Sequence, residues 1–389
     1  MKKPASPPAG VDSAKVALLT NFVDPQKVAF LETLGRKFGT FTIFVSTQRE
    51  GHRHWKIDTG TLHVEHQKTI TVKSCWRHPM GFKDVNYLHF PLDTYTRLKA
   101  YRPKVVISSQ LGLRTLSACL FRLLHWDTRL IVWVQMTEHQ QMGWRPVRKW
   151  IRKCILRCVD AVIANGHSAK RYMAGLGFPE ETIFISLGSI ELGRFLAMPP
   201  KSQVSRIRRF LYVGRLVDGK GILQFLSRLA VFAESNSSVQ LVFEVIGYGP
   251  LEEAIKGAQH PPNLEIRYGG ARSHDTLPAI YASSDVFVLP TLSDEWGMVI
   301  NEAMASGLPV LGSIYSQAVA ELVRDGINGW TFVPDRPETV DAAIGLIFAA
   351  SDEQLLTMGK NARRAVLSAA PELCAEGMFR AVESVFPTS

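Results

Sequence analysis

Short runs of apolar and β-branched residues alternate with helical stretches along almost the whole chain of 389 residues. Such runs are typical of strands that are buried on both faces, as they are in parallel sheets. Parallel neighbours need a crossover connection, which is usually a helix. The alternation therefore predicts an α/β fold built from doubly wound parallel sheets.

The predicted strands fall into two groups, with helical stretches between them. The first group is Lys15–Asn21, Phe41–Thr47, Val105–Ser109, Arg129–Gln135, Ala161–Ala164 and Thr182–Leu187. The second group is Phe210–Leu216, Leu241–Gly247, Leu264–Tyr268, Val286–Pro290, Pro309–Gly312 and Trp330–Val333. Between the groups, Met198–Gln203 is polar and proline-rich, which indicates an interdomain linker.

Two Rossmann-like domains are therefore expected, at residues 1–195 and 196–389, facing each other across a central cleft. The last helix is a candidate to pack back on the N-terminal domain. Because ligands of open α/β sheets bind at the carboxyl ends of the strands, the chemistry is expected in the loops that follow them.

The positive charge of the chain lies in its first half. Residues 1–196 contain 29 Lys and Arg and 14 Asp and Glu, whereas residues 197–389 contain 16 and 21, within a total net charge of +10. This asymmetry suggests that the first domain meets an anionic surface, either membrane headgroups or nucleic acid.

Several classes of protein are disfavoured by the sequence. The start, Met1–Lys3 followed by prolines, has no apolar core of a secretory signal. The apolar stretch Val105–Trp126 is interrupted by two arginines and falls short of the ~18 apolar residues of a spanning helix. The five cysteines are sparse and have no zinc-site spacing, so we expect free thiols, no metal site and a cytoplasmic location.

The loop Gly214–Gly221 places Arg215 and Lys220 around a glycine-rich turn that opens a helix. Two cations beside helix N–H groups suit a diphosphate, although basic surface residues in a turn would give the same pattern. The turn Ala271–Ser273, which includes Arg272, follows another strand, and its small residues would let a nucleobase approach the backbone. A tight turn without a ligand is the alternative there.

A third loop leads into a helix that Gly297 opens. The first N–H groups of this helix, at Met298 and Val299, would favour a negative ligand. Glu302 on the same helix could accept two hydrogen bonds from a vicinal diol such as a ribose. Asp294, eight residues earlier, could hold hydroxyls of a second sugar.

These motifs resemble family 4 of the retaining glycosyltransferases with the GT-B fold. The family pattern Gly-Arg-x4-Lys-Gly matches Gly214–Gly221, and its Glu-x7-Glu pattern matches Asp294 and Glu302, followed by Ala-Met-Ala-Ser-Gly-Leu-Pro-Val. The resemblance is close over residues 210–335 and looser in the first half. Asp294 replaces the first Glu of the family with Glu295 beside it, which leaves open which carboxylate reaches the donor sugar.

The resemblance implies a metal-independent, cofactor-free transferase of the hexosyltransferase type that retains the anomeric configuration. Arg215 and Lys220 would neutralise the leaving diphosphate, Glu302 would bind the ribose, and the turn at Ala271–Ser273 would hold the base. Asp294 and the N–H groups of Met298 and Val299 would hold the donor sugar and diphosphate, with Gly214, Glu295 and Gly297 completing the donor site. The departing phosphate oxygen would take the acceptor proton, so no side-chain nucleophile is required.

The acceptor side of the site is less well defined by the sequence. Many relatives carry a glycine-rich turn after the first strand, whereas this chain has Asn21–Pro25. Many relatives also place a histidine beside the donor sugar after a central strand. The run that ends at His139 makes His139, or Glu138, the candidate, against an exposed loop histidine as the alternative.

The stretch Arg145–Cys158 is predicted to be a helix without acidic residues, and it bears on the charge of the first half. At helical spacing its cations fall on one face, and the other face is formed by Val147, Trp150, Ile151, Cys154 and Cys158. The helix either buries its apolar stripe and solvates its charges or displays cations to anionic lipid. The residues assigned to this membrane or acceptor side are Arg145, Arg148, Lys149, Trp150, Arg152, Lys153 and Arg157.

The leading hypothesis is therefore a glycosyltransferase that uses a UDP-sugar, or next a GDP-sugar, and acts on a glycan or lipid-linked acceptor in bacterial polysaccharide or glycolipid synthesis. It would work in the cytoplasm, with peripheral association to an anionic membrane as an open alternative. A sugar-nucleotide-binding protein without transferase activity, or an epimerase, is the second hypothesis. A nucleic-acid-binding protein is disfavoured because no motif supports it. The sequence does not define the oligomeric state.

Overall fold

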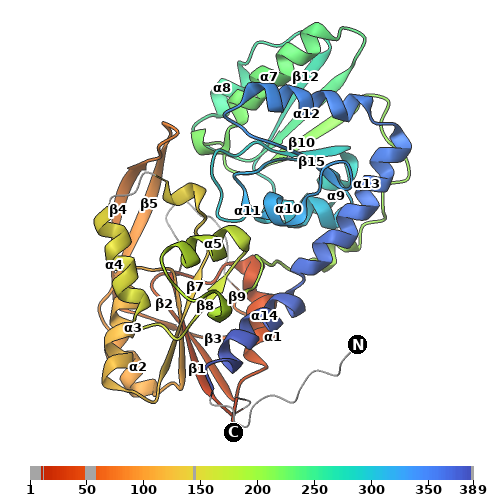
Figure 1. Ribbon diagram of the computed structural model, residues 1–389. Helices are drawn as coiled ribbons and strands as arrows, with labels where there is room; N and C mark the ends of the chain where they lie inside the picture. The colour runs from red at the N-terminus through yellow and green to blue at the C-terminus, as the bar shows by residue number, and fades with distance from the viewer. Residues whose placement is uncertain (1–9, 12, 49–57, 143–145, 387–389) are drawn as a thin grey trace. The chain divides into compact units, whose positions relative to one another are not determined.

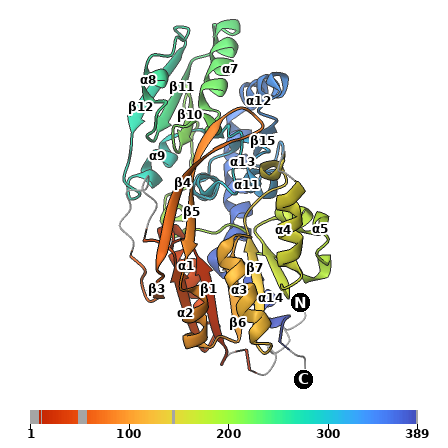
Figure 2. The same cartoon turned by 90° about the vertical axis from the view of Figure 1, so that its left-hand side faces the viewer.

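The computed structural model describes residues 10–11, 13–48, 58–142 and 146–386 of the chain. It divides into two compact units, the first made of residues 1–76, 85–191 and 369–389 and the second of 77–84 and 192–368. Figures 1 and 2 show a twisted sheet flanked by helices in each unit. The predicted fold of two Rossmann-like, doubly wound α/β units is confirmed.

The main sheet of the first unit is parallel throughout and has the order β3-β2-β1-β6-β7-β8-β9. Its strands are β1 (Lys15–Thr20), β2 (Thr40–Val45), β3 (His63–His66), β6 (Val105–Ser109), β7 (Arg129–Val134), β8 (Ala161–Ala164) and β9 (Ile183–Ile185). A separate two-stranded sheet is formed by β4 (Thr69–Arg77) and β5 (Lys83–Pro91). The central strands are buried on both faces, which explains their uninterrupted apolar runs.

Helices cover both faces of this sheet. They are α1 (Val28–Gly35), α2 (Thr94–Tyr101), α3 (Leu113–Leu124), α4 (Pro146–Leu156), α5 (His167–Gly175) and α14 (Pro371–Glu383), with short 3-10 turns at Pro25–Lys27, His139–Gln141, Glu180–Thr182 and Val366–Ala369. On one face, α2, α3 and α4 contribute Leu98, Phe121 and Ile155 to a shared core cluster. On the other face, Phe30 of α1 packs against Trp133, with ring centroids 6.0 Å apart.

The sheet of the second unit is also parallel and has the order β12-β11-β10-β13-β14-β15. Its strands are β10 (Arg208–Val213), β11 (Leu241–Ile246), β12 (Leu264–Gly270), β13 (Val286–Leu289), β14 (Val310–Ser313) and β15 (Gly329–Phe332). Its helices are α6 (Gly193–Leu196), α7 (Ile222–Ser235), α8 (Glu252–Lys256), α9 (Leu277–Ser283), α10 (Met298–Ala305), α11 (Gln317–Leu322), α12 (Pro337–Ala349) and α13 (Asp352–Ala365), with a 3-10 turn at Asp218–Lys220.

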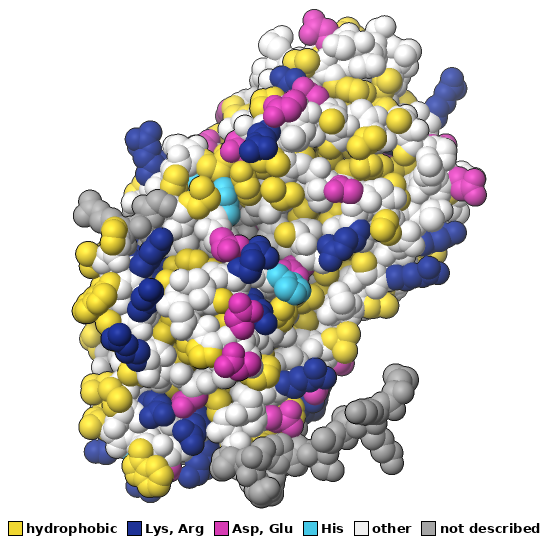
Figure 3. Space-filling view, viewed as in Figure 1, with side chains coloured by type: hydrophobic (Ala, Val, Ile, Leu, Met, Phe, Trp, Pro, Cys, Tyr) yellow, Lys and Arg dark blue, Asp and Glu magenta, His cyan; other side chains and the backbone are white. Residues whose placement is uncertain are grey.

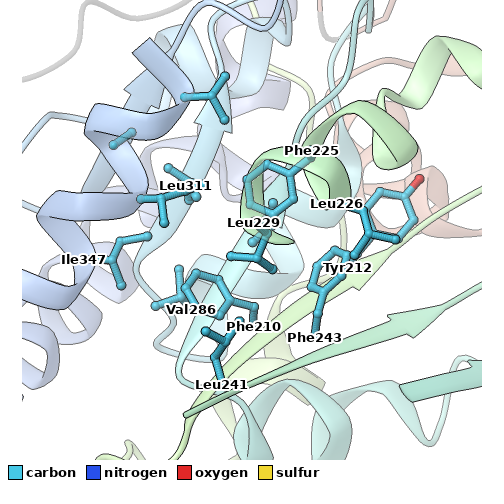
Figure 4. Close-up of a cluster of buried hydrophobic side chains, with 14 of the residues drawn as sticks. Phe210, Tyr212, Phe225, Leu226, Leu229, Leu241, Phe243, Val286, Leu311 and Ile347 are labelled. Carbon is cyan, nitrogen blue, oxygen red and sulfur yellow. The ribbon is translucent and has the colours of Figure 1, made fainter. Parts of the chain in front are cut away.

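The core of the second unit lies between its sheet and α7 and α12 (Figure 4). Phe225 and Leu229 of α7 pack onto Phe210 and Phe243 of the sheet, and the rings of Phe225 and Phe243 lie 5.7 Å apart. Ile347 of α12 closes the cluster. This packing fixes the strands whose carboxyl ends carry the candidate site.

The last helix, α14, belongs to the first unit, which is the domain on which the sequence made it a candidate to pack. Its apolar face is buried against α1 and β9, where the rings of Phe379 and Phe38 lie 5.7 Å apart. Lys37 of the chain segment after α1 forms a 2.8 Å ion pair with Glu376. The structure therefore divides the chain after Glu191 and returns residues 369–389 to the first unit.

The proline-rich stretch that indicated a linker lies within the second unit. Lys201 forms an ion pair with the buried carboxylate of Asp285, just before β13, and donates to the carbonyl of Ser284. The same carboxylate accepts hydrogen bonds from the backbone N–H groups of Ser205 and Arg209, at 3.2 and 2.8 Å. These contacts fasten the segment to the sheet.

Candidate functional site

The candidate site lies in the second unit, in the loops that follow β10, β12 and β13. Because β10 pairs directly with β13, the loops after these two strands lie side by side. Parallel strands end at the same edge of a sheet, so this edge is where the fold collects its loop residues.

The loop after β10 is shaped by buried contacts. The hydroxyl of fully buried Tyr212 donates to the carbonyl of Arg215 at 2.7 Å, and burial raises the pKa of Tyr212 well above its ordinary value. Gly221, which precedes α7, has a φ of +66°, and a Cβ there would lie 2.1 Å from the carbonyl oxygen of Pro290. Only glycine fits this close approach without a shift of the backbone.

The loops after β10 and β13 are held together by hydrogen bonds to one carbonyl. The carbonyl of Gly219 accepts from the backbone N–H of Leu292 at 2.9 Å and from the hydroxyl of Thr291 at 3.1 Å. The spacing of the sequence motifs did not indicate this link, since the two loops are about 70 residues apart in the chain. The loop Gly214–Gly221, predicted to bind the diphosphate, and the loop that carries Asp294, predicted to bind the sugar, are therefore directly bonded to each other.

Lys220 and Asp294 form an ion pair in the middle of this structure. The side chain of each is 17% exposed, so the pair is largely but not fully shielded from water. Asp294 is held further by its backbone N–H, which donates to the carbonyl of Tyr315 at 3.0 Å. Glu295 is exposed, whereas Asp294 faces the lysine, which makes Asp294 the carboxylate closer to the cationic loop.

The N-terminus of α10 is positioned by a tight turn. Gly297 has a φ of +98°, and a Cβ there would lie 2.8 Å from Ser316 Oγ. The indole N–H of Trp296 donates to Asn301 Oδ1 at 2.8 Å and fixes the turn to the helix. Met298 and Val299, the first helical residues, are half-buried at this edge.

Glu302 of α10 is buried, with 1% exposure, and belongs to a hydrogen-bonded network. Tyr281 of α9 donates its hydroxyl to Glu302 Oε2 at 2.7 Å, and His274 Nε2 lies 3.5 Å from Glu302 Oε1. Burial and the carboxylate raise the pKa of Tyr281 well above its ordinary value. The hydrogen bond to Glu302 also raises the pKa of His274, against burial, which lowers it.

His274 connects the third predicted segment to α10. The turn Ala271–Ser273, which includes Arg272, is exposed after β12, and His274 follows it directly. Arg194 approaches from α6, where its guanidinium lies 2.9 Å from His274 Nδ1. Sequence reasoning missed both residues, because neither belongs to a recognisable motif.

A further loop, Gly247–Pro250, was treated only as the end of a strand in the sequence. It follows β11, and a Cβ at Gly247 would lie 1.8 Å from the carbonyl oxygen of Gly214. The backbone N–H of Leu216 donates to the carbonyl of Tyr248 at 2.9 Å. The sequence Gly-Tyr-Gly-Pro directly after a predicted strand could have indicated that this loop lies beside the loop Gly214–Gly221.

The residues predicted in the first half lie in the first unit. His139 begins the turn His139–Gln141 after β7 and is half-buried. Glu138 is exposed and forms a 2.9 Å ion pair with Arg171 of α5. Both residues follow the carboxyl end of β7, where the sequence placed them.

The predicted orientation of the basic helix is wrong in part. Arg152, which was assigned to the exposed cations, is buried, whereas Val147, Trp150 and Ile151 are exposed. The buried side of α4 is formed by Arg152, Ile155 and Leu156. Arg148, Lys149, Lys153 and Arg157 are exposed as predicted, and Arg145 lies outside the described residues.

Within the part of the chain that the structure describes, no group of three or more His, Cys, Asp and Glu side chains is placed to hold a metal ion. No helix in this part of the chain is long and apolar enough to cross a membrane.

The geometry defines a class of protein. Two parallel α/β units, with a pair of cationic residues, a carboxylate and a helix N-terminus at one sheet edge, are typical of proteins that bind a nucleoside diphosphate derivative. Two family models match the chain, "Glycosyl transferases group 1" over residues 199–365 and "Glycosyl transferase 4-like domain" over residues 34–188. The chain belongs to the group 1 glycosyltransferases with the GT-B fold, as the sequence motifs indicated.

Curated relatives match part of the chain. A 2-deoxystreptamine N-acetyl-D-glucosaminyltransferase of Streptomyces fradiae is 30% identical over 42% of this chain and 37% of its own length. A UDP-Gal:alpha-D-GlcNAc-diphosphoundecaprenol alpha-1,3-galactosyltransferase of Escherichia coli is 30% identical over 41% of each chain. The chain thus spans only about two fifths of the length of these two relatives.

Solved structures share the fold over nearly the whole chain. HepE of Anabaena in complex with UDP superposes with a TM-score of 0.71 and 15% identity, covering 95% of this chain and all of that one. The lipopolysaccharide outer core galactosyltransferase WaaB gives a TM-score of 0.67 at 14% identity, covering 96% of this chain and all of that one. At these identities the likeness establishes the fold alone.

Proposed function

We propose that this protein is a retaining glycosyltransferase that moves a hexose from a nucleotide sugar, a UDP-sugar before a GDP-sugar, to a glycan or lipid-linked acceptor. The observation that carries the proposal is the ion pair between Lys220 and Asp294, which joins the two loops at the carboxyl ends of β10 and β13. A cation and the carboxylate to which we assign the sugar thus lie side by side, next to the N-terminus of α10.

The donor diphosphate would bind Arg215 and Lys220 and the N–H groups at Met298 and Val299. A diphosphate carries more negative charge than one carboxylate, so it competes well with Asp294 for Lys220. Asp294, once released, would accept hydrogen bonds from the sugar hydroxyls. Glu302 would bind the ribose, and the exposed turn Ala271–Ser273 would lie beside the base.

Charge stabilisation by Arg215 and Lys220 would let the diphosphate leave without a metal ion. The departing phosphate oxygen would then take the acceptor proton on the same face of the sugar, which gives retention. By resemblance to the family, His139 at the carboxyl end of β7 stays the candidate histidine for the transfer step. Two measurements test these points: activity should persist in EDTA, and the product should have the anomeric configuration of the donor.

The acceptor class and location are inferred from relatives. The galactosyltransferase of E. coli acts, by its name, on a diphosphoundecaprenol-linked sugar, and WaaB is named for the lipopolysaccharide outer core. We infer a related role in bacterial polysaccharide or glycolipid synthesis, in the cytoplasm or at the cytoplasmic face of the membrane.

The donor site is tested by thermal shift and by titration with UDP-, GDP-, ADP- and TDP-sugars. A ligand that binds only the folded state stabilises it by about 2.7 kcal/mol at 100 times its Kd, and the melting temperature rises accordingly. Lys220→Ala and Glu302→Ala should weaken binding of the preferred donor by at least about tenfold, since each removes a charge-assisted hydrogen bond. Lys360→Ala, at an exposed lysine of α13, is the matched control. Intact affinity in both site variants would remove the basis of the proposal.

Asp294→Asn separates binding from transfer. The substitution removes the carboxylate that competes with the diphosphate for Lys220, so UDP should bind more tightly, by about threefold to tenfold. Transfer should nevertheless fall, because the amide holds the sugar hydroxyls less strongly. Weaker UDP binding in this variant would contradict the assigned competition.

A sugar-nucleotide-binding protein without transferase activity is the second candidate. It is favoured by one departure from the family pattern, the shorter Asp294 in place of the first Glu, engaged by Lys220. Donor hydrolysis or transfer to any acceptor would eliminate it. An epimerase would instead invert a donor-sugar centre, which analysis of the recovered nucleotide sugar would reveal.

A further inference from the structure

The outer faces of two helices in the first unit carry large exposed apolar side chains. Leu116, Leu120 and Leu123 of α3 are 42–63% exposed, and Val147, Trp150 and Ile151 of α4 are 41–65% exposed. We call these six residues the α3–α4 apolar surface. Trp126, just after α3, is 83% exposed. Contiguous exposed apolar groups of this size indicate a contact with another body.

The two helices are direct neighbours, so their apolar faces belong to one region. Cys119 of α3 donates its thiol to the carbonyl of Ile155 of α4 at 3.9 Å, and both helices enter the same core cluster. The sequence spacing of the exposed residues is helical in each case, i, i+4, i+7 in α3 and i, i+3, i+4 in α4. The apolar side chains therefore form a stripe on each helix, opposite to the side buried on the sheet.

The orientation of α4 is fixed by a buried arginine. Arg152 donates to Gln141 Oε1 at 2.7 Å and to the hydroxyl of Tyr172, and it lies over the ring of Tyr172 at 5.6 Å. Because Arg152 occupies the buried side, the residues on the opposite side of the helix turn outward. Trp150 is exposed as a consequence of this packing.

Cations flank the apolar stripe of α4. Lys149, Lys153 and Arg157 follow one another at i, i+4 and i+8, and Arg148 lies on the other flank. Neither α3 nor α4 contains an acidic residue. Figure 3 shows hydrophobic and basic side chains together along the edge of the molecule over α4.

We propose that the α3–α4 apolar surface docks the protein on an anionic lipid bilayer. Apolar side chains would enter the boundary between headgroups and acyl chains, while Arg148, Lys149 and Lys153 of α4, together with Arg157 directly after it, would contact lipid phosphates. A second copy of the chain fits less well, because a two-fold contact would bring these cations together without acidic partners. The inference rests on the proposed function for the membrane-face location, names the surface that would provide it, and uses residues of the first unit alone.

The test is flotation of the full chain with vesicles of phosphatidylcholine and phosphatidylglycerol in equal amounts, and with phosphatidylcholine alone. The wild type should float with the anionic vesicles, and high salt should release most of it. Lys149→Glu/Lys153→Glu should lower the partition coefficient by at least about 25-fold, because each lysine near an anionic surface contributes about fivefold. Lys360→Glu/Arg364→Glu on α13 changes the net charge equally and should leave partitioning within about twofold.

The apolar contribution is tested separately. Leu120→Ser/Leu123→Ser should weaken the flotation that the wild type retains at high salt, because this remaining binding depends on burial of apolar surface. Leu346→Ser/Leu373→Ser, at two exposed leucines outside α3 and α4, is the matched control. An unchanged thermal shift by UDP in each variant verifies that the fold and the donor site are intact.

Three results would overturn the proposal. The wild type could remain unbound in the presence of anionic vesicles. The α13 charge variant could lose as much binding as the α4 variant, which would make the effect one of net charge. The chain could form a dimer that the leucine substitutions in α3 dissociate, which would assign the surface to a contact between copies. Loss of flotation with intact UDP binding separates this inference from the proposed function.

Discussion

Removal of one hydroxyl group, in Tyr281→Phe, tests how the buried carboxylate of Glu302 is held. Tyr281 is fully buried and donates to Glu302 Oε2 at 2.7 Å. Phenylalanine keeps the ring contacts with Phe195 and Phe287, at centroid distances of 5.8 and 5.7 Å. The substitution therefore removes a hydrogen bond and little apolar packing.

The expected cost follows from the charge of the acceptor. A hydrogen bond to a charged group contributes about 1.5–3 kcal/mol, compared with about 1 kcal/mol for a neutral pair. Glu302 is 1% exposed in the free protein, so solvent is a poor replacement for the lost donor. We expect about 2 kcal/mol of destabilisation, which for a unit of this size lowers Tm by about 4–8 °C.

Tyr212→Phe is the matched control. Tyr212 is also fully buried, but its hydroxyl donates to a neutral carbonyl, that of Arg215, at 2.7 Å. Its loss should lower Tm by about 2–4 °C, roughly half the effect. Differential scanning calorimetry of both variants gives the comparison directly.

A double-mutant cycle with Glu302→Gln isolates the charge. In the background of the Glu302→Gln variant, the cost of Tyr281→Phe should fall to about 1 kcal/mol, which leaves a coupling energy of about 1 kcal/mol. An equal cost in both backgrounds, or a Tm change of less than about 1 °C, would refute the assigned role of the carboxylate.

Three further perturbations have defined outcomes. Asp285→Ala leaves Lys201 and two backbone N–H groups without their acceptor. Breaking a buried ion pair costs about 3–5 kcal/mol, so Tm should fall by more than about 6 °C. A fall of less than about 2 °C would contradict this expectation. The hydrogen bond to Glu302 raises the pKa of His274, so the interaction stabilises the fold fully below pH 6.5, the ordinary pKa, and is lost as pH rises through the folded-state pKa. His274→Gln should therefore lower Tm more at about pH 5.5 than at about pH 9. An equal Tm difference at both pH values would exclude that linkage. Gly221→Ala should lower Tm more than Gly326→Ala and should also weaken UDP binding. Both glycines have φ near +70°, but only at Gly221 would a Cβ lie within 4 Å of another part of the backbone. Equal effects on Tm would show that conformational strain alone is responsible.

The parallel sheets were predictable because their strands are buried on both faces. Leu130, Ile131 and Val132 of β7, for example, are all fully buried, and in a chain with alternating helices a run of this kind indicates a strand of a parallel sheet.

The position of α14 was harder to predict. Its apolar face is no different in kind from those of α12 and α13, and it is the packing against α1 and β9, with Phe379 beside Phe38 and Glu376 paired with Lys37, that assigns it to the first unit.

The loops of the candidate site were predictable where motifs mark them, at Gly214–Gly221 and around Asp294 and Glu302. The links between them were not, because Gly219 and Leu292 meet only in the folded sheet. His274 and Arg194 reach the network around Glu302 from segments without a motif. Long-range hydrogen bonds of this kind leave no spacing signal in a single sequence.

The orientation of α4 shows where periodicity fails and what the failure implies. Its seven-residue run Val147–Lys153 contains both cations and large apolar side chains, so a helical projection allows either set to face the sheet. Hydrogen bonds to Gln141 and Tyr172 hold Arg152 on the inner side, and Trp150 and Val147 remain outside. Each large apolar side chain left in water forgoes about 1.5–3 kcal/mol of burial. A bilayer that covers the helix would recover that free energy. The positive charge of the first half and the exposed Trp150 therefore support the same interpretation, which is a surface for contact with anionic lipid.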